Sequence, residues 1–244
     1  MNNEIFSIIM PAYNAEKTIF YSIESILNQT YSNFKIYIIN DNSCDKTENI
    51  ILSFSDERII YIKNKKNMGV SLSRNIGIKL SKGKFIAFLD SDDLWVPNKL
   101  EEQYKKLING WDVVCSNYTT FDETNQIKHR VSPEIINYSD MLLSNFIGNL
   151  TGVYNKDNIG KVYQKNKGHE DYIMWLDILK KSKKAYCIQK PLAKYRISEK
   201  SLSGNKLKAM QWQWSIYRNE LNLSFIKSSY YFINYIYNAL KKRK

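Results

Sequence analysis

An apolar run that ends in acidic residues constrains this chain more than any other feature. Residues 84–93, KFIAFLDSDD, pass from a stretch that suits a buried strand directly to Asp90, Asp92 and Asp93. Because carboxylates are costly to bury alone, we expect these acids to emerge at the carboxyl end of the strand and to meet a cation there. Their oxygen ligands suit Mg²⁺ or Mn²⁺ better than zinc. The alternative is a helix cap before residues 94–97, for which one acid would suffice.

Strand-like and helix-like patterns alternate from the start of the chain to this acidic motif. The predicted strands are residues 5–10, stopped by Pro11, 35–40, 59–62 and 85–89, and the predicted helices between them are residues 19–27, 50–54 and 70–80. This alternation predicts an α/β fold with a doubly wound, mostly parallel sheet and helices on both faces. Such sheets bind ligands at the carboxyl ends of their strands.

The rest of the chain predicts shorter elements. They are a helix at residues 97–108 with Pro97 in its first turn, a strand at 111–118, a loop at 120–133, a helix at 141–146 capped by Ser139, a strand at 150–154, a helix from Asp171 through Leu179, and two closing strands at 185–188 and 192–197. No internal repeat or low-complexity linker is visible.

Composition limits the compartments and the binding partners that we expect for the protein. With 244 residues and 43% hydrophobic content, the chain can bury a sizeable core. Its three cysteines are far apart, and neither a secretory signal nor a run of transmembrane length is visible, so we expect a cytoplasmic protein. The formal net charge of +12 calls for a polyanionic neighbour. No nucleic-acid-binding signature directs this charge at bases, whereas an anionic membrane face fits the basic C-terminal half.

The C-terminal segment, residues 205–244, is unusually aromatic and ends in four basic residues, 241–244. Aromatic rings flanked by lysines suit the headgroup region of a membrane. The alternative is a helix that packs on the domain or on a second subunit, as in a homodimer. The aromatic residues are Trp212, Trp214, Tyr217, Phe225, Tyr230, Tyr231, Phe232, Tyr235 and Tyr237.

Further polar residues follow other predicted strands. Asp41 could accept a hydrogen bond from a nucleotide base or form an Asx turn, and Tyr13 could stack on that base or belong to the core. Arg74 could meet phosphate or a neighbouring acid, after a segment, residues 67–69, that lets the backbone approach a ligand.

A second group of acidic residues lies about eighty residues after Asp90–Asp93 along the chain. Glu170 and Asp171 stand at a predicted helix start, where capping alone explains acids. His169 before them could join a site or be an ordinary surface histidine.

Taken together, a series of short motifs resembles glycosyltransferase family 2. Each motif is weak alone, and their order and spacing make the match specific over the first hundred or so residues. The motifs are Ser7–Asn14, Gln29–Tyr31, Asn40–Ser43, Asn67–Gly69, Ser73–Asn75 and Asp90–Asp93, with His169–Asp171 resembling the later Glu-Asp motif of that family.

The resemblance implies a GT-A fold, a nucleotide-diphosphate sugar donor and inversion at the anomeric carbon. It implies that Asp171 is the catalytic base, supported by Glu170 and His169, and that Asp92 and Asp90 hold Mn²⁺ or Mg²⁺. The implied nucleotide-sugar-binding residues are Pro11, Tyr13, Asp41, Asn67, Gly69, Arg74, Asp90, Ser91 and Asp93. Asn40 and Asn42 depart from the commoner Asp and Gly of the family's second motif.

The resemblance also suggests a substrate class and a division of the chain. The Gln-x-x-Arg-Trp motif of processive synthases is absent, so we expect transfer of a single glucose or galactose from a UDP-sugar. The acceptor would be a lipid-diphosphate-linked HexNAc, as in bacterial O-antigen or capsule synthesis. Residues 1–204 would form the catalytic domain, with a nucleotide-sugar-binding half (1–118) and an acceptor-binding half (119–204). Residues 205–244 would associate with the inner face of the cytoplasmic membrane or pack on protein.

Two other functions fit parts of the sequence. A sugar-phosphate nucleotidyltransferase shares the α/β fold and the metal requirement, but its glycine-rich basic phosphate loop is absent from residues 5–17. A non-enzymatic module that binds membranes or nucleic acid would explain the charge but not the acids at the end of a strand.

Overall fold

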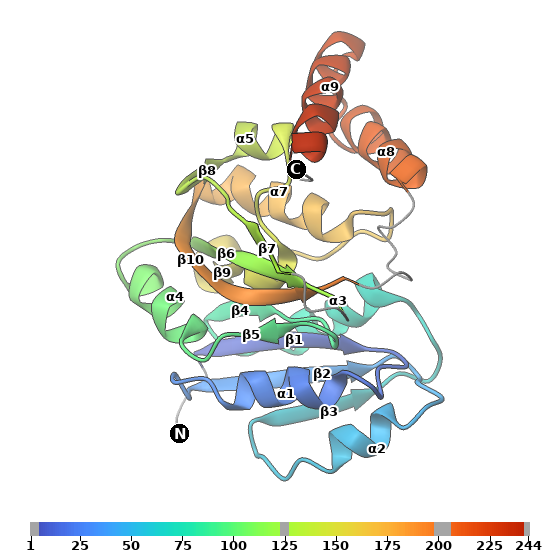
Figure 1. Cartoon of the computed structure of the whole chain (residues 1–244), viewed down its shortest axis with the longest axis vertical. Helices are drawn as coiled ribbons and strands as arrows, with labels where there is room; N and C mark the ends of the chain where they lie inside the picture. Colours follow the sequence, from blue (N-terminus) through green and yellow to red (C-terminus); the bar gives the residue numbers. More distant parts are fainter. Residues whose placement is uncertain (1–4, 123–126, 198–205, 242–244) are drawn as a thin grey trace.

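The computed structural model describes residues 5–122, 127–197 and 206–241, which build one large mixed sheet flanked by helices (Figure 1). The strands follow the order β3-β2-β1-β4-β9-β6-β10-β5, with β7 paired to β6 and β8 to β10. The strand bounds are β1 (Phe6–Ala12), β2 (Phe34–Asn40), β3 (Ile59–Lys63), β4 (Phe85–Phe88), β5 (Leu94–Trp95), β6 (Val113–Phe121), β7 (Lys128–Arg130), β8 (Ile135–Asn137), β9 (Val153–Asn155) and β10 (Lys184–Arg196). The helix bounds are α1 (Ile19–Leu27), α2 (Thr47–Leu52), α3 (Val70–Leu80), α4 (Lys99–Ile108), α5 (Tyr138–Leu143), η1 (Asn149–Thr151), α6 (Lys156–Ile159), α7 (Glu170–Ser182), α8 (Lys206–Ser215), η3 (Ile216–Glu220) and α9 (Phe225–Lys241).

The N-terminal half is the predicted doubly wound unit. Strands β3, β2, β1 and β4 are parallel neighbours, so the chain segments that follow β1, β2 and β4 meet at one edge of the sheet. Strand β1 continues past Pro11 to Ala12, because Pro11 pairs in register with Ile39 of β2, and the predicted stop at Pro11 is therefore wrong.

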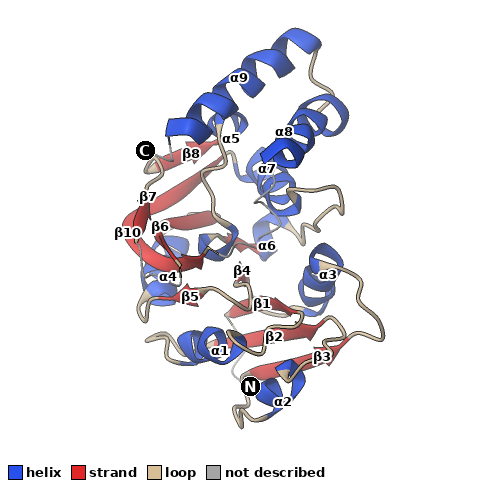
Figure 2. Ribbon diagram, turned by 45° about the vertical axis from the view of Figure 1, so that its right-hand side comes forward, coloured by secondary structure: helices blue, strands red, loops and turns tan. Residues whose placement is uncertain are grey.

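Successive residues of the central strands point into two separate cores. Ile8 packs with α1, α2 and α4 on one face, whereas Ile9 packs with α3 and α7 on the other. Figure 2 shows α3 and α7 on one side of the sheet and α4 on the other. This alternation explains why the central strands are continuous apolar runs: both of their faces are covered by helices. The predicted α/β architecture with helices on both faces is confirmed.

The second half departs from the prediction where strands from distant segments meet. Residues 120–133 are not a plain loop, because β6 extends to Phe121 and pairs with β7. The two predicted closing strands are one bent strand, β10, which runs parallel to β6 with register shifts on either side of Pro191. Residues 149–151 form the helical turn η1 rather than the beginning of a strand, and β9 follows at Val153.

Several predicted helix starts are displaced, and α2 begins at Thr47 rather than at residue 50. Helix α5 begins at Tyr138, and its cap is Asn137 rather than Ser139, because the Asn137 side chain accepts the Asp140 amide in a reciprocal capping box. Helix α4 begins at Lys99, so Pro97 precedes the first turn.

The C-terminal helices pack on the domain through part of their aromatic surface. Tyr217 is fully buried, and the ring of Trp214 contacts those of Phe225 and Phe232. Within the ranges that the structure describes, no helix combines the length and the hydropathy that a membrane crossing requires.

Candidate functional site

A cavity of about 890 Å³ opens at the carboxyl ends of the central strands. Its lining comes from the segments after β1 and β4, from α3, β6 and η1, from the start of α7, from the end of β10, and from α8. Its volume lies in the range of small-molecule binding sites. The predicted site residues that line it are Tyr13, Arg74, Asp90, Asp92, Asp93, His169, Glu170 and Asp171.

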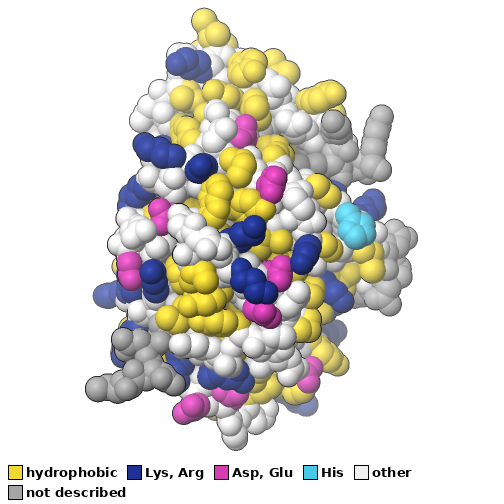
Figure 3. Space-filling model, turned by 90° about the vertical axis from the view of Figure 1, so that its left-hand side faces the viewer, with side chains coloured by type: hydrophobic (Ala, Val, Ile, Leu, Met, Phe, Trp, Pro, Cys, Tyr) yellow, Lys and Arg dark blue, Asp and Glu magenta, His cyan; other side chains and the backbone are white. Residues whose placement is uncertain are grey.

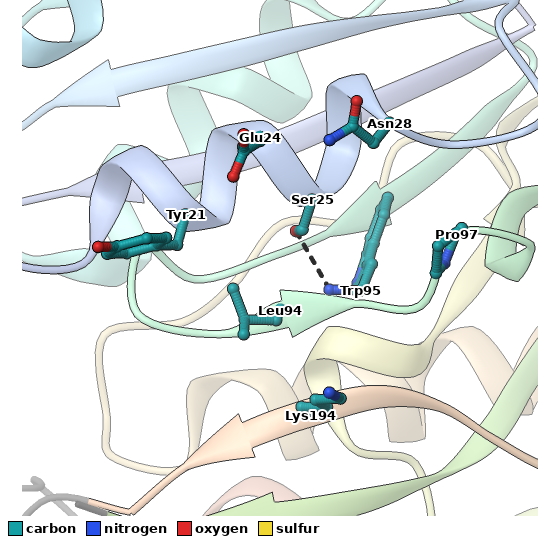
Figure 4. Close-up of a pocket in the computed structure, with 8 residues that line it drawn as sticks. All are labelled: Tyr21, Glu24, Ser25, Asn28, Leu94, Trp95, Pro97 and Lys194. Carbon is teal, nitrogen blue, oxygen red and sulfur yellow. Dashed lines mark hydrogen bonds between the residues drawn. The ribbon is translucent and has the colours of Figure 1, made fainter.

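A second, smaller cavity lies between α1 and β5 (Figure 4). Its volume is about 230 Å³, less than a typical small-molecule site needs, and the backbone amide of Trp95 there donates to Ser25 Oγ at 3.2 Å. None of the predicted site residues lines it, so it does not compete with the larger cavity as the candidate site.

Pro11, Asp41, Asn67, Gly69 and Ser91 are not among the residues that line the large cavity. The buried carboxylate of Asp41 accepts hydrogen bonds from the amides of residues 68 and 69, the latter at 2.8 Å. It therefore holds in place the loop that precedes α3, where Gly69 has a φ of +89° that favours glycine. A direct contact between Asp41 and a nucleotide base stays a prediction.

The acidic motif after β4 is only partly neutralised. Buried Arg74 on α3 forms an ion pair with Asp90 and donates to Gln164 Oε1 at 3.2 Å. Burial alone would lower the pKa of Arg74, but the adjacent Asp90 carboxylate raises it, with smaller contributions from Asp171 and Glu170. Carboxylates of both acidic groups, Asp90 on one side and Glu170 and Asp171 on the other, thus stabilise the charged form of Arg74.

Asp92 and Asp93 lack such a partner. Burial, followed by the charge of Asp90, raises the pKa of Asp92 to about 6. Burial and the charge of Asp92 raise the pKa of fully buried Asp93 well above its usual range. Asp92 forms no ion pair with any described residue. The site therefore holds more negative charge than its own basic residues balance, which favours a bound cation.

Arg196, at the end of β10, was not predicted as a site residue. Its amide donates to Asp93 Oδ1 at 2.8 Å, its Nε donates to the Asp92 carbonyl at 3.0 Å, and its guanidinium lies 4.5 Å from the centre of the Phe121 ring. It lines the cavity beside the acidic motif. Only the pairing of β10 with β6 brings it there, and a lysine- and arginine-rich sequence gives no local signal for it.

The second acidic group is positioned by a tight turn before α7. Gly168 and His169 both have left-handed φ values, +76° and +51°, which direct the chain into the helix. Glu170 and Asp171 occupy the first turn of α7, where the helix dipole stabilises acids, and both line the cavity. The His169 ring contacts the Ala209 carbonyl of α8 through Nε2 at 3.3 Å.

Two more lining residues, Trp212 and Asn149, were not among the predicted catalytic, metal or nucleotide-sugar-binding residues. Trp212 of α8 packs over Gly168, where a Cβ atom would lie 2.4 Å from the indole. Asn149 of η1 is 8% exposed, and neither of its amide atoms has a hydrogen-bond partner among the described residues. Such an unpaired amide is costly, so its place at the cavity indicates a partner supplied from outside the protein.

The donor set suits a divalent cation that a substrate helps to bind. Among the described residues, no cluster of three or more His, Cys, Asp or Glu side chains could hold a metal alone. Mg²⁺ and related ions use one or two carboxylates together with substrate phosphates, and Asp92 and Asp90 supply that number. Asp90 is already paired with Arg74, and the charge of Asp92, which no described residue balances in an ion pair, makes the residues present a fit for such an ion.

Comparisons with known proteins agree with this arrangement. A model of the family "Glycosyl transferase family 2" matches residues 7–159. WfgD of Escherichia coli, described as a UDP-Glc:alpha-D-GlcNAc-diphosphoundecaprenol beta-1,3-glucosyltransferase, is 37% identical over 99% of this chain and 96% of its own length. WfaP of Escherichia coli, described in the same words, is 37% identical over 88% of this chain and 86% of its own length. The crystal structure of S. aureus TarS 1-349 in complex with UDP-GlcNAc matches with a TM-score of 0.71 at 19% identity, covering 88% of this chain and 67% of that chain.

Proposed function

The chain belongs to glycosyl transferase family 2 and is a glycosyltransferase, and on this premise we propose that it transfers glucose from UDP-glucose to an α-GlcNAc-diphosphoundecaprenol acceptor, forming a β-1,3 linkage. Identity to WfgD and WfaP over most of the chain supports this donor and acceptor. Such a product belongs to the assembly of a bacterial surface polysaccharide. Family membership decides against the nucleotidyltransferase and the non-enzymatic binding module.

One observation carries the proposal: a single cavity is lined by both Asp92, from the acidic motif after β4, and Asp171, at the start of α7. A transferase of this kind needs a group that balances the leaving diphosphate and a base for the acceptor hydroxyl, both beside one sugar. In this proposal Tyr13 stacks on the uracil, and Arg74 and Arg196 contact the diphosphate.

We assign the metal to Asp92 and Asp90, with Mn²⁺ or Mg²⁺ as the ion. When bound, it neutralises charge on the diphosphate leaving group. Asp171 accepts the proton of the acceptor hydroxyl, whose oxygen bonds to C1 of the glucose while the bond from C1 to the UDP oxygen breaks. This single displacement inverts an α-linked donor to a β-linked product. Glu170 and His169 hold the turn that presents Asp171.

The hexose would lie between Asp93 and η1. Gly148 precedes Asn149 and packs against Tyr118, where a Cβ atom would lie 3.1 Å from the ring. Tyr118 lines the same cavity as Asp93 and Asp171. A glucose hydroxyl at this position would supply the partner that the Asn149 amide lacks.

We further propose that the protein binds the anionic inner face of the cytoplasmic membrane through α9. One side of α9 exposes apolar side chains at alternating spacings of four and three residues, which places them on one stripe. No acidic residue follows Glu220, and the chain ends in the basic residues 241–244. A homodimer through the same stripe is the alternative. The stripe consists of Ile226, Tyr230, Ile233, Tyr237 and Leu240.

The division of the chain follows from these roles. Residues 1–118 would bind the nucleotide sugar, residues 119–204 the acceptor, and residues 205–244 the membrane or the domain itself. The two catalytic halves share one continuous sheet, in which β9 pairs with both β4 and β6.

The experiment that tests the proposal measures UDP release from UDP-glucose, UDP-galactose, UDP-GlcNAc and UDP-GalNAc, with Mn²⁺ or with EDTA. The acceptors are synthetic α-GlcNAc- and α-GalNAc-diphosphate lipids. We expect release from UDP-glucose that requires both Mn²⁺ and the GlcNAc acceptor. Release from another donor would refute the glucose assignment, and release that ignores the acceptor would refute the proposed transfer.

A further inference from the structure

Helix α8 contributes an aromatic wall to the cavity that also contains the proposed base. Trp212 lies in the C-terminal segment, residues 205–244, yet it lines the same cavity as Asp171. Most other aromatic side chains of this segment pack on one another or lie on the surface, as Trp214 and Tyr230 do. The position of Trp212 therefore needs a separate explanation.

The indole is held rigidly next to the catalytic turn. It packs over Gly168, where any side chain would collide with it, and its ring meets that of His169 edge-to-face with centroids 5.5 Å apart. These two residues directly precede Glu170 and Asp171. A fixed, half-buried aromatic surface beside the base is suited to a ligand whose reacting hydroxyl must reach that base.

The helix that carries this wall stands apart from the helix assigned to the donor phosphates. In Figures 1 and 2, α7 lies between α3, which carries Arg74, and α8. The donor diphosphate is assigned to Arg74 and Arg196, on the side of α3 and the end of β10. A group bound against Trp212 would therefore be the second substrate.

A cationic side chain stands one helical turn from the indole. Lys208 Nζ lies 5.0 Å from the centre of the Trp212 ring, and the side chain is exposed. Lys208 Nζ lies over the face of the ring, an arrangement that suits a sugar diphosphate: the diphosphate draws the ammonium group away, and the apolar face of the sugar covers the ring in its place.

We propose that Trp212 and Lys208 form the acceptor subsite, in which Trp212 stacks on the acceptor sugar and Lys208 pairs with the diphosphate that links this sugar to its lipid. This assignment rests on the proposed function for its ligand class, a sugar diphosphate. It gives the C-terminal segment a role in acceptor choice that is independent of its contact with a membrane.

The test measures binding and turnover separately, with a GlcNAc-α-diphosphate that bears a short alkyl chain as the probe. Trp212→Ala is expected to weaken binding of this probe about tenfold and to raise the acceptor KM by a similar factor. Trp212→Phe is expected to recover most of the loss. UDP affinity and the slow hydrolysis of UDP-glucose without acceptor are expected to stay within about twofold, because neither needs the subsite.

Lys208→Ala is expected to weaken binding of the diphosphate probe several-fold but to leave binding of alkyl α-GlcNAc, which has no phosphate, unchanged. Lys227→Ala, which removes an exposed lysine from α9, is the matched control and is expected to bind both as the unmodified protein does.

Three results would overturn the subsite: probe binding unaffected by Trp212→Ala, a parallel loss of UDP-glucose hydrolysis that marks a purely structural role at Gly168, or no probe binding by the unmodified protein. If the unmodified protein binds the probe through Trp212 and Lys208 but transfers no glucose to it, the subsite stands and the proposed donor fails.

Discussion

At the scale of single residues, substitutions of Asp171 and of Asp92 are expected to impair the enzyme in different ways. Asp171→Asn removes the proposed base, so we expect kcat to fall about 10²–10⁴-fold while UDP affinity stays near that of the unmodified protein. Asp92→Asn is expected to lower both kcat and the Mn²⁺-dependent affinity for UDP. UDP release and calorimetric titration with UDP measure these effects.

The control is Asp177→Asn, which changes a surface acid of the same helix that pairs with Lys180. It is expected to keep full activity, because exposed ion pairs contribute little. Undiminished turnover by Asp171→Asn would remove this residue from the mechanism.

Metal removal tests the acidic motif as a whole. EDTA is expected to abolish UDP release, and added Mn²⁺ is expected to restore it, because Arg74 is already paired with Asp90 and leaves Asp92 unbalanced. Titration of activity against Mn²⁺ should give a midpoint that moves to higher concentration in Asp90→Asn. Full activity after dialysis against EDTA would exclude a metal requirement.

The sequence predicts those site residues that lie next to one another along the chain and directly after a recognisable strand. Residues 90–93 stand out because they place acids directly after a strand of clear pattern. Residues 169–171 were singled out only through the family resemblance, because capping alone explains acids at a helix start. Arg196 and Trp212 do not stand out, because they reach the cavity only through the pairing of β10 and the packing of α8. The same holds for Asn149, because only the three-dimensional structure shows that its buried amide has no hydrogen-bond partner among the described residues.

At the scale of elements, the N-terminal strands and helices were predictable because periodicity and burial agree there. The errors lie where tertiary contacts override a local signal. Pro11 stays inside β1, where it pairs in register with Ile39 of β2. Strand β10 continues through Pro191, because the register of its pairing with β6 shifts on either side of the proline.

Helix α4 carries a buried charge that makes its stability dependent on pH. Lys99 is fully buried, donates to Gln103 at 2.7 Å and lies 3.8 Å from the centre of the Trp95 ring. Burial lowers the pKa of Lys99 well below 10.5. Between the folded pKa and 10.5, the unfolded chain keeps a proton that the folded protein has released, so the contribution of Lys99 to stability rises with pH.

Lys99→Met removes this dependence. The difference in free energy of unfolding, variant minus unmodified protein, is therefore expected to fall as pH rises toward 10, by up to about 1.4 kcal/mol per unit. Urea unfolding at a series of pH values measures it, and other titrating groups cancel in the difference. Parallel stability profiles for the two proteins would show that Lys99 does not titrate differently in the folded state.

At the scale of the whole molecule, charge and apolar surface are unevenly distributed. The formal net charge is +12, and the last acidic residue is Glu220. Figure 3 shows hydrophobic side chains along the whole face, including several at the upper end of the molecule, where Figure 1 places α9. The sequence left open whether the aromatic tail packs on protein or faces a membrane. The structure divides the tail, since Tyr217 is buried in the core and Phe232 packs against it, whereas the α9 stripe defined above stays exposed.

This exposed stripe predicts binding to anionic bilayers. Ile226→Glu with Ile233→Glu should reduce co-sedimentation with vesicles rich in phosphatidylglycerol at least about tenfold, because the change removes apolar contact and adds negative charge at an anionic surface. Leu52→Glu with Ile108→Glu makes the same change in charge at exposed sites on α2 and α4 and is expected to bind as the unmodified protein does. Phosphatidylcholine vesicles alone should bind weakly, since they lack the attraction for the basic terminus. If the unmodified protein ignores both kinds of vesicle and light scattering instead finds a dimer that the α9 variant breaks, the stripe is an interface between two copies and the membrane assignment is wrong.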